Sequence, residues 1–229
     1  MSVRKNPYAA HSLSPAFKWK SAVNEKGFSA WLIITFLYLA MLVVFLNRFL
    51  PFINRRRGIS LRDPLLAYLP PADLSIWIFS VIYLAMLMAL LYLLSQPHLL
   101  LRTLIAAAIV YTVRIFTLYW VPLDPPSGCI PLADPFILHF AYGGILITKD
   151  LFFSGHTASM LLLVLAVDNR ILKTFLAGAL TAVMIMLLYQ HAHYSIDIAG
   201  ALIITPICWK VSHFPLRESQ SGRTVFPLN

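Results

Sequence analysis

Two long runs without a charged side chain constrain this chain more than any other feature. Residues 28–46 form a run of 19 residues, and residues 74–94 form a run of 21. A helix rises about 1.5 Å per residue, so each run is long enough to cross the roughly 30 Å hydrocarbon layer of a membrane. Soluble domains rarely need helices of this kind, and we therefore expect an integral membrane protein.

The composition agrees with a membrane location. The 229 residues are 59% hydrophobic and 12% charged, and the mean hydropathy is +0.77. So few polar residues cannot cover a water-facing surface. The net charge of +9 would suggest nucleic acid for a soluble protein, but the basic residues lie mostly in tails and loops, where anionic lipid headgroups attract them. We expect membrane lipids as partners and no nucleic acid.

Six membrane spans account for the hydropathy pattern. They are expected at about residues 28–46, 74–94, 99–121, 151–167, 171–190 and 194–211. Backbone groups in hydrocarbon need partners within their own segment, so each span is predicted to be a helix. The predicted fold is an all-α, polytopic membrane bundle. Its expected parts are a basic N-terminal tail (1–27), a catalytic membrane domain (28–211) and a C-terminal tail (212–229).

The arrangement of loops predicts which ends of the spans share a membrane face. The two long connections, residues 47–73 and 122–150, lie on one face because two spans separate them. With both termini cytoplasmic, the inner face carries eleven lysines and arginines and the outer face six, which agrees with the positive-inside rule. The arginines at positions 55–57 oppose this orientation. The balance predicts cytoplasmic termini.

Ionisable residues gather at the outer ends of the last four spans. Such residues are costly at membrane depth and are kept where they pair or function. His191, which lies two residues before His193, is not expected to be a nucleophile, and a supporting role is the alternative for it. The whole cluster consists of Arg114, Asp150, His156, His191, His193 and Asp197. The predicted topology brings all of them to the exoplasmic or periplasmic face, which we therefore expect to carry the active site.

The spacing of His193 and Asp197 suggests nucleophilic chemistry. They are four residues apart, so they share a helix face if the last helix starts early enough. The carboxylate would then accept the imidazole proton and leave the other ring nitrogen as a nucleophile. His156 is suited to protonate the departing oxygen.

The remaining residues predict a phosphate site that needs no metal or other cofactor. Arg114 offers positive charge, Gly155 allows close backbone approach, and Ser154 with the free amides of the fourth span can donate to an anion. Asp150 is included in this site, although it could instead complement the helix dipole. Arg114 could be a structural ion pair or a snorkelling side chain. Zinc on the histidines and Asp197 is a further alternative, but no typical ligand set is completed.

Two sequence blocks resemble a known family. Residues 150–157 read D-L-F-F-S-G-H-T, and residues 191–197 read H-A-H-Y-S-I-D. They resemble the signature blocks of the superfamily of lipid phosphatases and phosphotransferases that includes the type-2 phosphatidic acid phosphatases, in detail its sphingomyelin synthase branch. Residues 70–73 and, in the third span, Arg102, Tyr111, Arg114 and Thr117 are similar to earlier segments of that branch.

The resemblance implies a mechanism and a substrate class. His193 would attack phosphorus with support from Asp197, and His156 would act on the leaving group through a phosphohistidine intermediate. The substrates would be phospholipids and lipid alcohols. The chain has Thr148 and Lys149 where the eukaryotic synthases have Cys-Gly, and Ala192 replaces an acidic residue.

The acceptor of the phosphate group decides the name of the activity. A lipid hydroxyl would make the protein a synthase of the sphingomyelin or ceramide-phosphoethanolamine type. Water would make it a lipid phosphatase or a phospholipase C. A non-catalytic scaffold or transporter is the alternative from another class, but all three proposed catalytic residues are present. The oligomeric state is left open.

Overall fold

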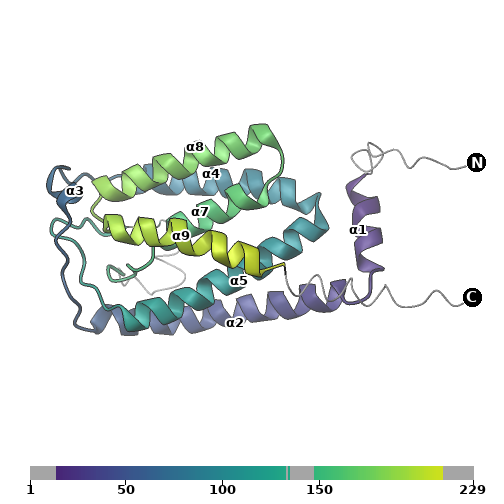
Figure 1. Ribbon diagram of the computed structural model, residues 1–229, viewed down its shortest axis with the longest axis horizontal. Helices are drawn as coiled ribbons and strands as arrows, with labels where there is room; N and C mark the ends of the chain where they lie inside the picture. Colours follow the sequence, from purple (N-terminus) through teal and green to yellow (C-terminus); the bar gives the residue numbers. More distant parts are fainter. Residues whose placement is uncertain (1–13, 133, 135–146, 214–229) are drawn as a thin grey trace, which may run out of the picture.

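The chain folds into an elongated helical bundle, which confirms the predicted all-α membrane fold (Figure 1). The computed structural model describes residues 14–132, 134 and 147–213. Over these residues the helices are α1 (Pro15–Val23), α2 (Phe28–Arg55), α3 (Pro64–Ala67), α4 (Ser75–Leu94), α5 (Pro97–Trp120), α7 (Gly155–Ala166), α8 (Arg170–Tyr189) and α9 (Ser195–Val211). Residues 1–13 of the expected N-terminal tail and residues 214–229 of the expected C-terminal tail lie outside the described residues.

A helix lies at each of the six expected positions, but their lengths differ. Among the described residues, α2, α4, α5 and α8 are the four helices long and apolar enough to cross a membrane. Helix α9 has 17 residues, and α7 has only 12. At about 1.5 Å per residue, α7 is roughly 18 Å long, well short of the hydrocarbon thickness. The bundle therefore has four helices of spanning length in its described part rather than six.

The fourth expected span was predicted to start at about residue 151, and α7 begins four residues later, at Gly155. The residues before it are not helical, and side chains of α5 donate hydrogen bonds to their carbonyl groups. Thr117 Oγ1 donates to the Phe152 carbonyl at 3.1 Å, and Arg114 Nε donates to the Phe153 carbonyl at 2.8 Å. Non-helical backbone is tolerated at membrane depth only where it is satisfied in this way.

Helix α2 continues past its expected end at residue 46. It runs to Arg55, with Pro51 inside the helix, so the connection predicted for residues 47–73 begins nine residues later. The prediction stopped near the first charge, Arg48. A long arginine side chain can lie along the apolar surface with its guanidinium in water, and therefore does not end a helix.

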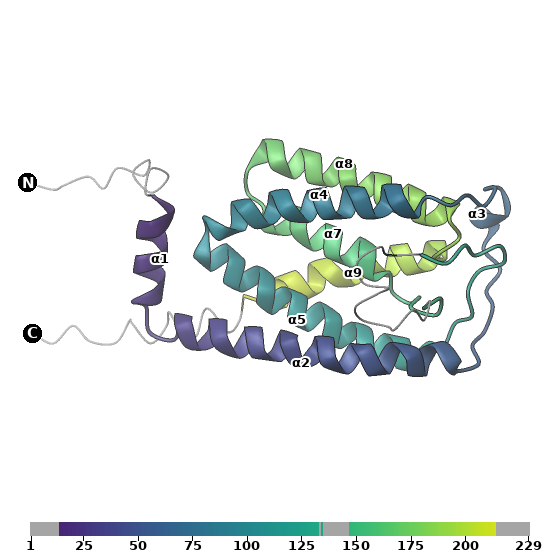
Figure 2. The same ribbon diagram turned by 180° about the vertical axis from the view of Figure 1, so that it is seen from behind.

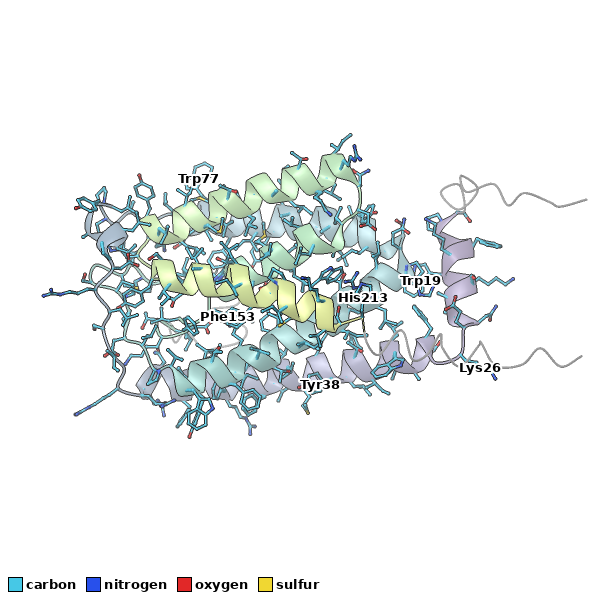
Figure 3. The ribbon with its side chains drawn as sticks, in the orientation of Figure 1. Trp19, Lys26, Tyr38, Trp77, Phe153 and His213 are labelled. Atoms are coloured by element: carbon cyan, nitrogen blue, oxygen red, sulfur yellow. The ribbon has the colours of Figure 1, made fainter. Side chains whose placement is uncertain are left out.

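Helix α7 lies at the centre of the bundle and contacts α4, α5, α8 and α9 (Figures 1 and 2). Two buried apolar clusters fix it there. The larger joins α7 to α4 and α8 and includes Ile78, Ala85, Met160, Leu176 and Val183. The smaller joins it to α5 and α9 and includes Val110, Phe153, Ala158, Ala201 and Cys208. Phe153 lies between α5 and α9 in Figure 3.

Helix α1 lies across one end of the bundle, while α3 lies at the other (Figure 1). Trp19 Nε1 donates to the Leu94 carbonyl at 2.7 Å, and Lys18 Nζ donates to Gln96 Oε1 at 3.3 Å. Part of the expected basic tail is thus a short helix attached to the turn between α4 and α5. The chemistry-bearing residues lie toward the opposite end, near α3.

Candidate active site

The turn between α8 and α9, residues 190–194, is held by the two long connections. The Tyr194 hydroxyl donates to the Asp124 carbonyl at 3.0 Å and accepts the Leu61 amide at 3.2 Å. The buried Gln190 amide donates to Ser75 Oγ at 2.7 Å. These contacts join segments more than 60 residues apart in the chain, so they position the His193 turn through tertiary structure.

A carboxylate from the first connection binds the start of α9. Asp63 Oδ2 accepts the Ser195 amide at 2.6 Å and its hydroxyl at 2.8 Å, and Asp63 Oδ1 accepts the Leu65 amide at 3.0 Å. Burial raises the pKa of Asp63, but the hydrogen bonds from Ser195 and from the first amides of α3 outweigh it. The net effect lowers the pKa below its ordinary value of 3.8.

His191 joins two loops and does not line the cavity described below. Its Nδ1 lies 2.8 Å from the Ser127 carbonyl and its Nε2 lies 3.0 Å from the Leu69 carbonyl. A neutral imidazole has one N–H and can donate to only one of these carbonyls at a time. Its φ of 52° ends α8 in the left-handed conformation. The alternative of a supporting role for His191 agrees with these contacts.

His193 and Asp197 are in hydrogen-bonding distance. His193 Nδ1 lies 3.3 Å from Asp197 Oδ2, and both side chains are buried. The contact does not arise as the sequence suggested, because α9 begins at Ser195 and His193 precedes it. The same carboxylate oxygen accepts the Tyr194 amide at 3.0 Å and so caps the helix.

His156 lies at the second position of α7 and faces the His193 ring. Their ring centroids are 6.2 Å apart, and the Phe79 ring packs edge-on against His156 with a centroid distance of 5.8 Å. Both histidines line a cavity of about 650 Å³. The structure thus brings His156 and His193 to one space, with Asp197 behind the second ring.

Arg114 is buried at the edge of this space and is paired with Asp150. Arg114 Nη2 lies 2.5 Å from Asp150 Oδ1, and Arg114 Nε donates to the Phe153 carbonyl. Asp150 lies five residues before Gly155, and the first turn of α7 has no acidic residue. The alternative in which Asp150 complements the dipole of α7 stays a prediction, because the Asp150 carboxylate lies beside Arg114, which packs against Gly155 at the start of α7. Asp150 orients Arg114 and offsets part of its charge.

Gly155 and Ser154 have different roles around this arginine. A Cβ atom on Gly155 would lie 2.7 Å from Arg114 Cζ and 2.9 Å from its Nη1, so the guanidinium lies directly against the glycine. Ser154 is fully buried and caps α7 by accepting the Thr157 amide at 3.3 Å. Ser154 does not line the cavity. Its side chain is therefore not positioned to donate directly to a phosphate bound there, as the sequence suggested.

Lys149 fixes the position of the loop segment that contains Asp150. Its ammonium lies 2.6 Å from Asp124 Oδ1 and 2.6 Å from the Arg56 carbonyl, while Asn54 Oδ1 accepts the Lys149 amide at 3.2 Å. The lysine at this position therefore ties the site to the end of α2 and to the second connection.

The cavity is polar at the histidine end and mostly apolar along the rest of its length, where Thr103 donates its hydroxyl proton to the Leu99 carbonyl. From Arg114 on α5 it continues to Leu100 and, on α4, to Leu93. At about 1.5 Å per residue, the α5 portion spans roughly 21 Å, similar to an extended acyl chain. The apolar walls are suited to hydrocarbon.

Sequence reasoning missed four polar residues of the cavity: Tyr83, Thr103, Asp134 and Ser159. The Tyr83 hydroxyl donates to the Asp134 carboxylate at 2.7–2.8 Å. Ser159 was detectable, because it follows His156 by three residues and so shares its helix face. Asp134 lies in a proline-containing connection without periodicity, so no local signal placed it.

Among the described residues, no group of three or more His, Cys, Asp or Glu side chains is placed to hold a metal ion. The zinc arrangement considered from the sequence is therefore not assembled in this part of the chain. His191, His193 and His156 do not share a common centre with further ligands.

The fold and site define a class: an integral membrane helical bundle with two facing histidines, one backed by a buried aspartate, at the head of an apolar cavity. The family model described as PAP2 superfamily C-terminal matches residues 149–214, which include every proposed catalytic residue. The match spans less than a third of the chain. It supports the type-2 phosphatidic acid phosphatase superfamily and an activity of the lipid phosphatase or phosphotransferase type. No curated protein matches the chain with significant similarity.

Proposed function

We propose that this protein is a membrane lipid phosphotransferase of the sphingomyelin synthase type, which moves a phospholipid headgroup phosphate to a lipid hydroxyl. The observation that carries the proposal is the His193–Asp197 pair beside His156. With Nδ1–H directed to Asp197, His193 Nε2 keeps its lone pair and can act as a nucleophile.

The first step transfers the phosphate group to the enzyme. His193 Nε2 attacks phosphorus, a P–N bond forms, and the P–O bond to the departing alcohol breaks. His156 donates a proton to that oxygen. In the second step His156 takes the proton of the acceptor hydroxyl, whose oxygen attacks phosphorus, and the P–N bond breaks. The two rings are close enough to act on opposite sides of one phosphate.

Arg114 and the amides at the start of α7 would hold the phosphate oxygens during both steps. Arg114 lines the cavity beside His156, and the N-terminus of a helix favours a bound anion. Asp150 would orient the guanidinium without contacting phosphate. These groups bind phosphate without a metal ion.

Product analysis tests the proposal. The purified full chain in detergent would be incubated with mixed phospholipids, ceramide and diacylglycerol, and the products would be identified by mass spectrometry. A phosphorylated lipid acceptor supports the transferase, whereas free phosphate or a free phosphorylated headgroup indicates a hydrolase. His193→Gln should abolish turnover, whereas His98→Gln, at the opposite end of the bundle, should retain it. Unchanged turnover in His193→Gln would contradict the nucleophile assignment.

We also propose that the site faces the exoplasmic or periplasmic side, with the catalytic domain of residues 28–211 between cytoplasmic termini. The excess of lysine and arginine on the opposite face supports this orientation. Arg57 is exposed at the site end, and Arg170 is exposed at the other end. An impermeant thiol reagent applied to intact cells should label Arg57→Cys and not Arg170→Cys; the reverse pattern would contradict the orientation.

A further inference from the structure

Two hydroxyl groups lie inside the cavity, one helical turn deeper than the proposed phosphate site. Tyr111 precedes Arg114 by three residues on α5, and Ser159 follows His156 by three residues on α7. Both line the cavity, and their oxygens are 2.9 Å apart. Three residues of helix correspond to about 4.5 Å, similar to the separation between phosphorus and a substituent on the neighbouring carbon of a lipid backbone.

The hydrogen bonds of this pair assign its protons. Ser159 Oγ lies 2.9 Å from the Gly155 carbonyl, which can only accept, so Ser159 uses its single proton there. The bond between the two hydroxyls must then use the proton of Tyr111. The tyrosine oxygen retains lone pairs that accept no hydrogen bond from the described residues. In this arrangement Tyr111 Oη is an acceptor at the wall of an apolar cavity.

From this accounting we infer that Tyr111 Oη accepts a hydrogen bond from the substrate lipid, and therefore selects lipids with a hydroxyl or amide N–H on the carbon next to the phosphate-bearing one. Monoacyl glycerolipids and N-acylated amino-alcohol lipids carry such a donor, whereas a diacyl glycerolipid has an ester there and no donor. The inference rests on the proposed function, because that function places the phosphate beside His156 and Arg114.

A matched pair of substrates isolates this one hydrogen bond. The pair is 1-oleoyl-glycerol 3-phosphate, which has a free hydroxyl, and 1-oleoyl-propanediol 3-phosphate, which lacks only that hydroxyl. Two ratios between the hydroxyl-bearing and the hydroxyl-free lipid are measured on the purified full chain in detergent. One is the ratio of kcat/KM values, with diacylglycerol supplied as the acceptor, and the other is the ratio of affinities from ligand-induced thermal stabilisation. We expect the hydroxyl-bearing lipid to be favoured about five- to tenfold, as for one hydrogen bond.

Tyr111→Phe should bring both ratios to within about twofold of one. Tyr38→Phe is the matched control, because the Tyr38 hydroxyl also bonds a hydroxyl of a neighbouring helix, Thr112 Oγ1 at 2.8 Å, but does not line the cavity. Figure 3 marks Tyr38 on α2. Tyr38→Phe should leave the preference unchanged.

Ser159→Ala should shift the lipid preference in the opposite direction, toward lipids that only accept a hydrogen bond. It releases the Tyr111 proton, so the tyrosine can donate to an acceptor. A third lipid carries a 2-methoxy group, which accepts a hydrogen bond but cannot donate one. In Ser159→Ala its kcat/KM and its affinity should rise relative to those of the hydroxyl-bearing lipid. In Tyr111→Phe neither its relative kcat/KM nor its relative affinity should rise.

The outcomes separate this inference from the proposed function. Turnover with the same ratio in wild type and Tyr111→Phe would overturn the inference and leave the function intact. Binding ratios as expected, without turnover of any phosphorylated lipid, would support the inference and overturn the function. A wild-type ratio near one in both measurements would show that the tyrosine oxygen does not recognise the lipid.

Discussion

His193 Nδ1 and the amide of Tyr194 share one acceptor, Asp197 Oδ2, at 3.3 Å and 3.0 Å. The carboxylate therefore both orients the proposed nucleophile and caps α9. Asp197→Asn keeps the size and an acceptor for the cap, but its amide can donate to the imidazole and reverse the tautomer. By analogy with triads, we expect kcat to fall about 10³- to 10⁴-fold, with little change in Tm.

Activity and thermal unfolding measured on the same preparation check this prediction. Asp168→Asn is the control, because this aspartate is exposed between α7 and α8 at the other end of the bundle. Activity of Asp197→Asn close to that of wild type would contradict a role for the carboxylate in orienting His193.

Gly155→Ala should impair catalysis by displacing the guanidinium of Arg114. The added Cβ would lie 2.7 Å from Arg114 Cζ, and the arginine is held by Asp150 and by the Phe153 carbonyl, so it cannot move away freely. We expect kcat/KM to fall by one to two orders of magnitude (about 1–3 kcal/mol), similar to the loss of one charged hydrogen bond.

Gly178→Ala is the control for the effect of a methyl group in a helix. Nothing lies within 4 Å of a Cβ at Gly178, and alanine is the better helix former. Its activity should equal that of wild type, with Tm equal or slightly higher. Equal kcat/KM values for both variants would show that the close contact at Gly155 does not matter.

Arg114→Lys should lower stability as well as activity. The guanidinium of Arg114 donates to both Asp150 and the Phe153 carbonyl. A lysine ammonium cannot reproduce this planar geometry, so one of these two acceptors would lose its hydrogen bond. We expect a loss of about 1–3 kcal/mol in the free energy of unfolding, measured by thermal unfolding in detergent. Arg170→Lys, at the exposed start of α8, should be neutral. An unchanged Tm in Arg114→Lys would contradict the structural part of this role.

The contact between Asp63 and Ser195 should make stability depend on acid pH. Because the pKa of Asp63 is lowered in the folded chain, its stabilising contribution is fully present above the ordinary value of 3.8. It is lost as the pH falls through the lower folded value. The Tm difference between wild type and Asp63→Asn should therefore be largest at neutral pH and shrink below about pH 4.

The measurement is a series of thermal unfolding curves from pH 3 to pH 7. Ser195→Ala removes only the hydroxyl donor and keeps the carboxylate, so it should give a smaller difference with the same pH trend. A difference between wild type and Asp63→Asn that stays constant over this range would contradict the prediction.

Local features of the sequence predicted the class of fold and the identity of the histidine–aspartate pair. Apolar runs of membrane length depend only on neighbouring residues, so α2, α4, α5 and α8 were found at their expected places. Residues four apart are close whenever the intervening backbone turns, so the contact between His193 and Asp197 occurs although α9 starts after the histidine.

Tertiary structure decided what depends on contacts between distant segments. Helix α7 starts at Gly155 and not near residue 151, because side chains of α5 donate to the carbonyl groups of the non-helical residues before it. Asp150 pairs with Arg114 across 36 residues, and Ser159 meets Tyr111 across 48. Apolar runs and motif spacing carry no information about which side chains of packed helices face each other. The sequence alone therefore determined a membrane bundle with a candidate histidine site, and only packing decided how the cavity and the proposed phosphate site next to Tyr111 are built.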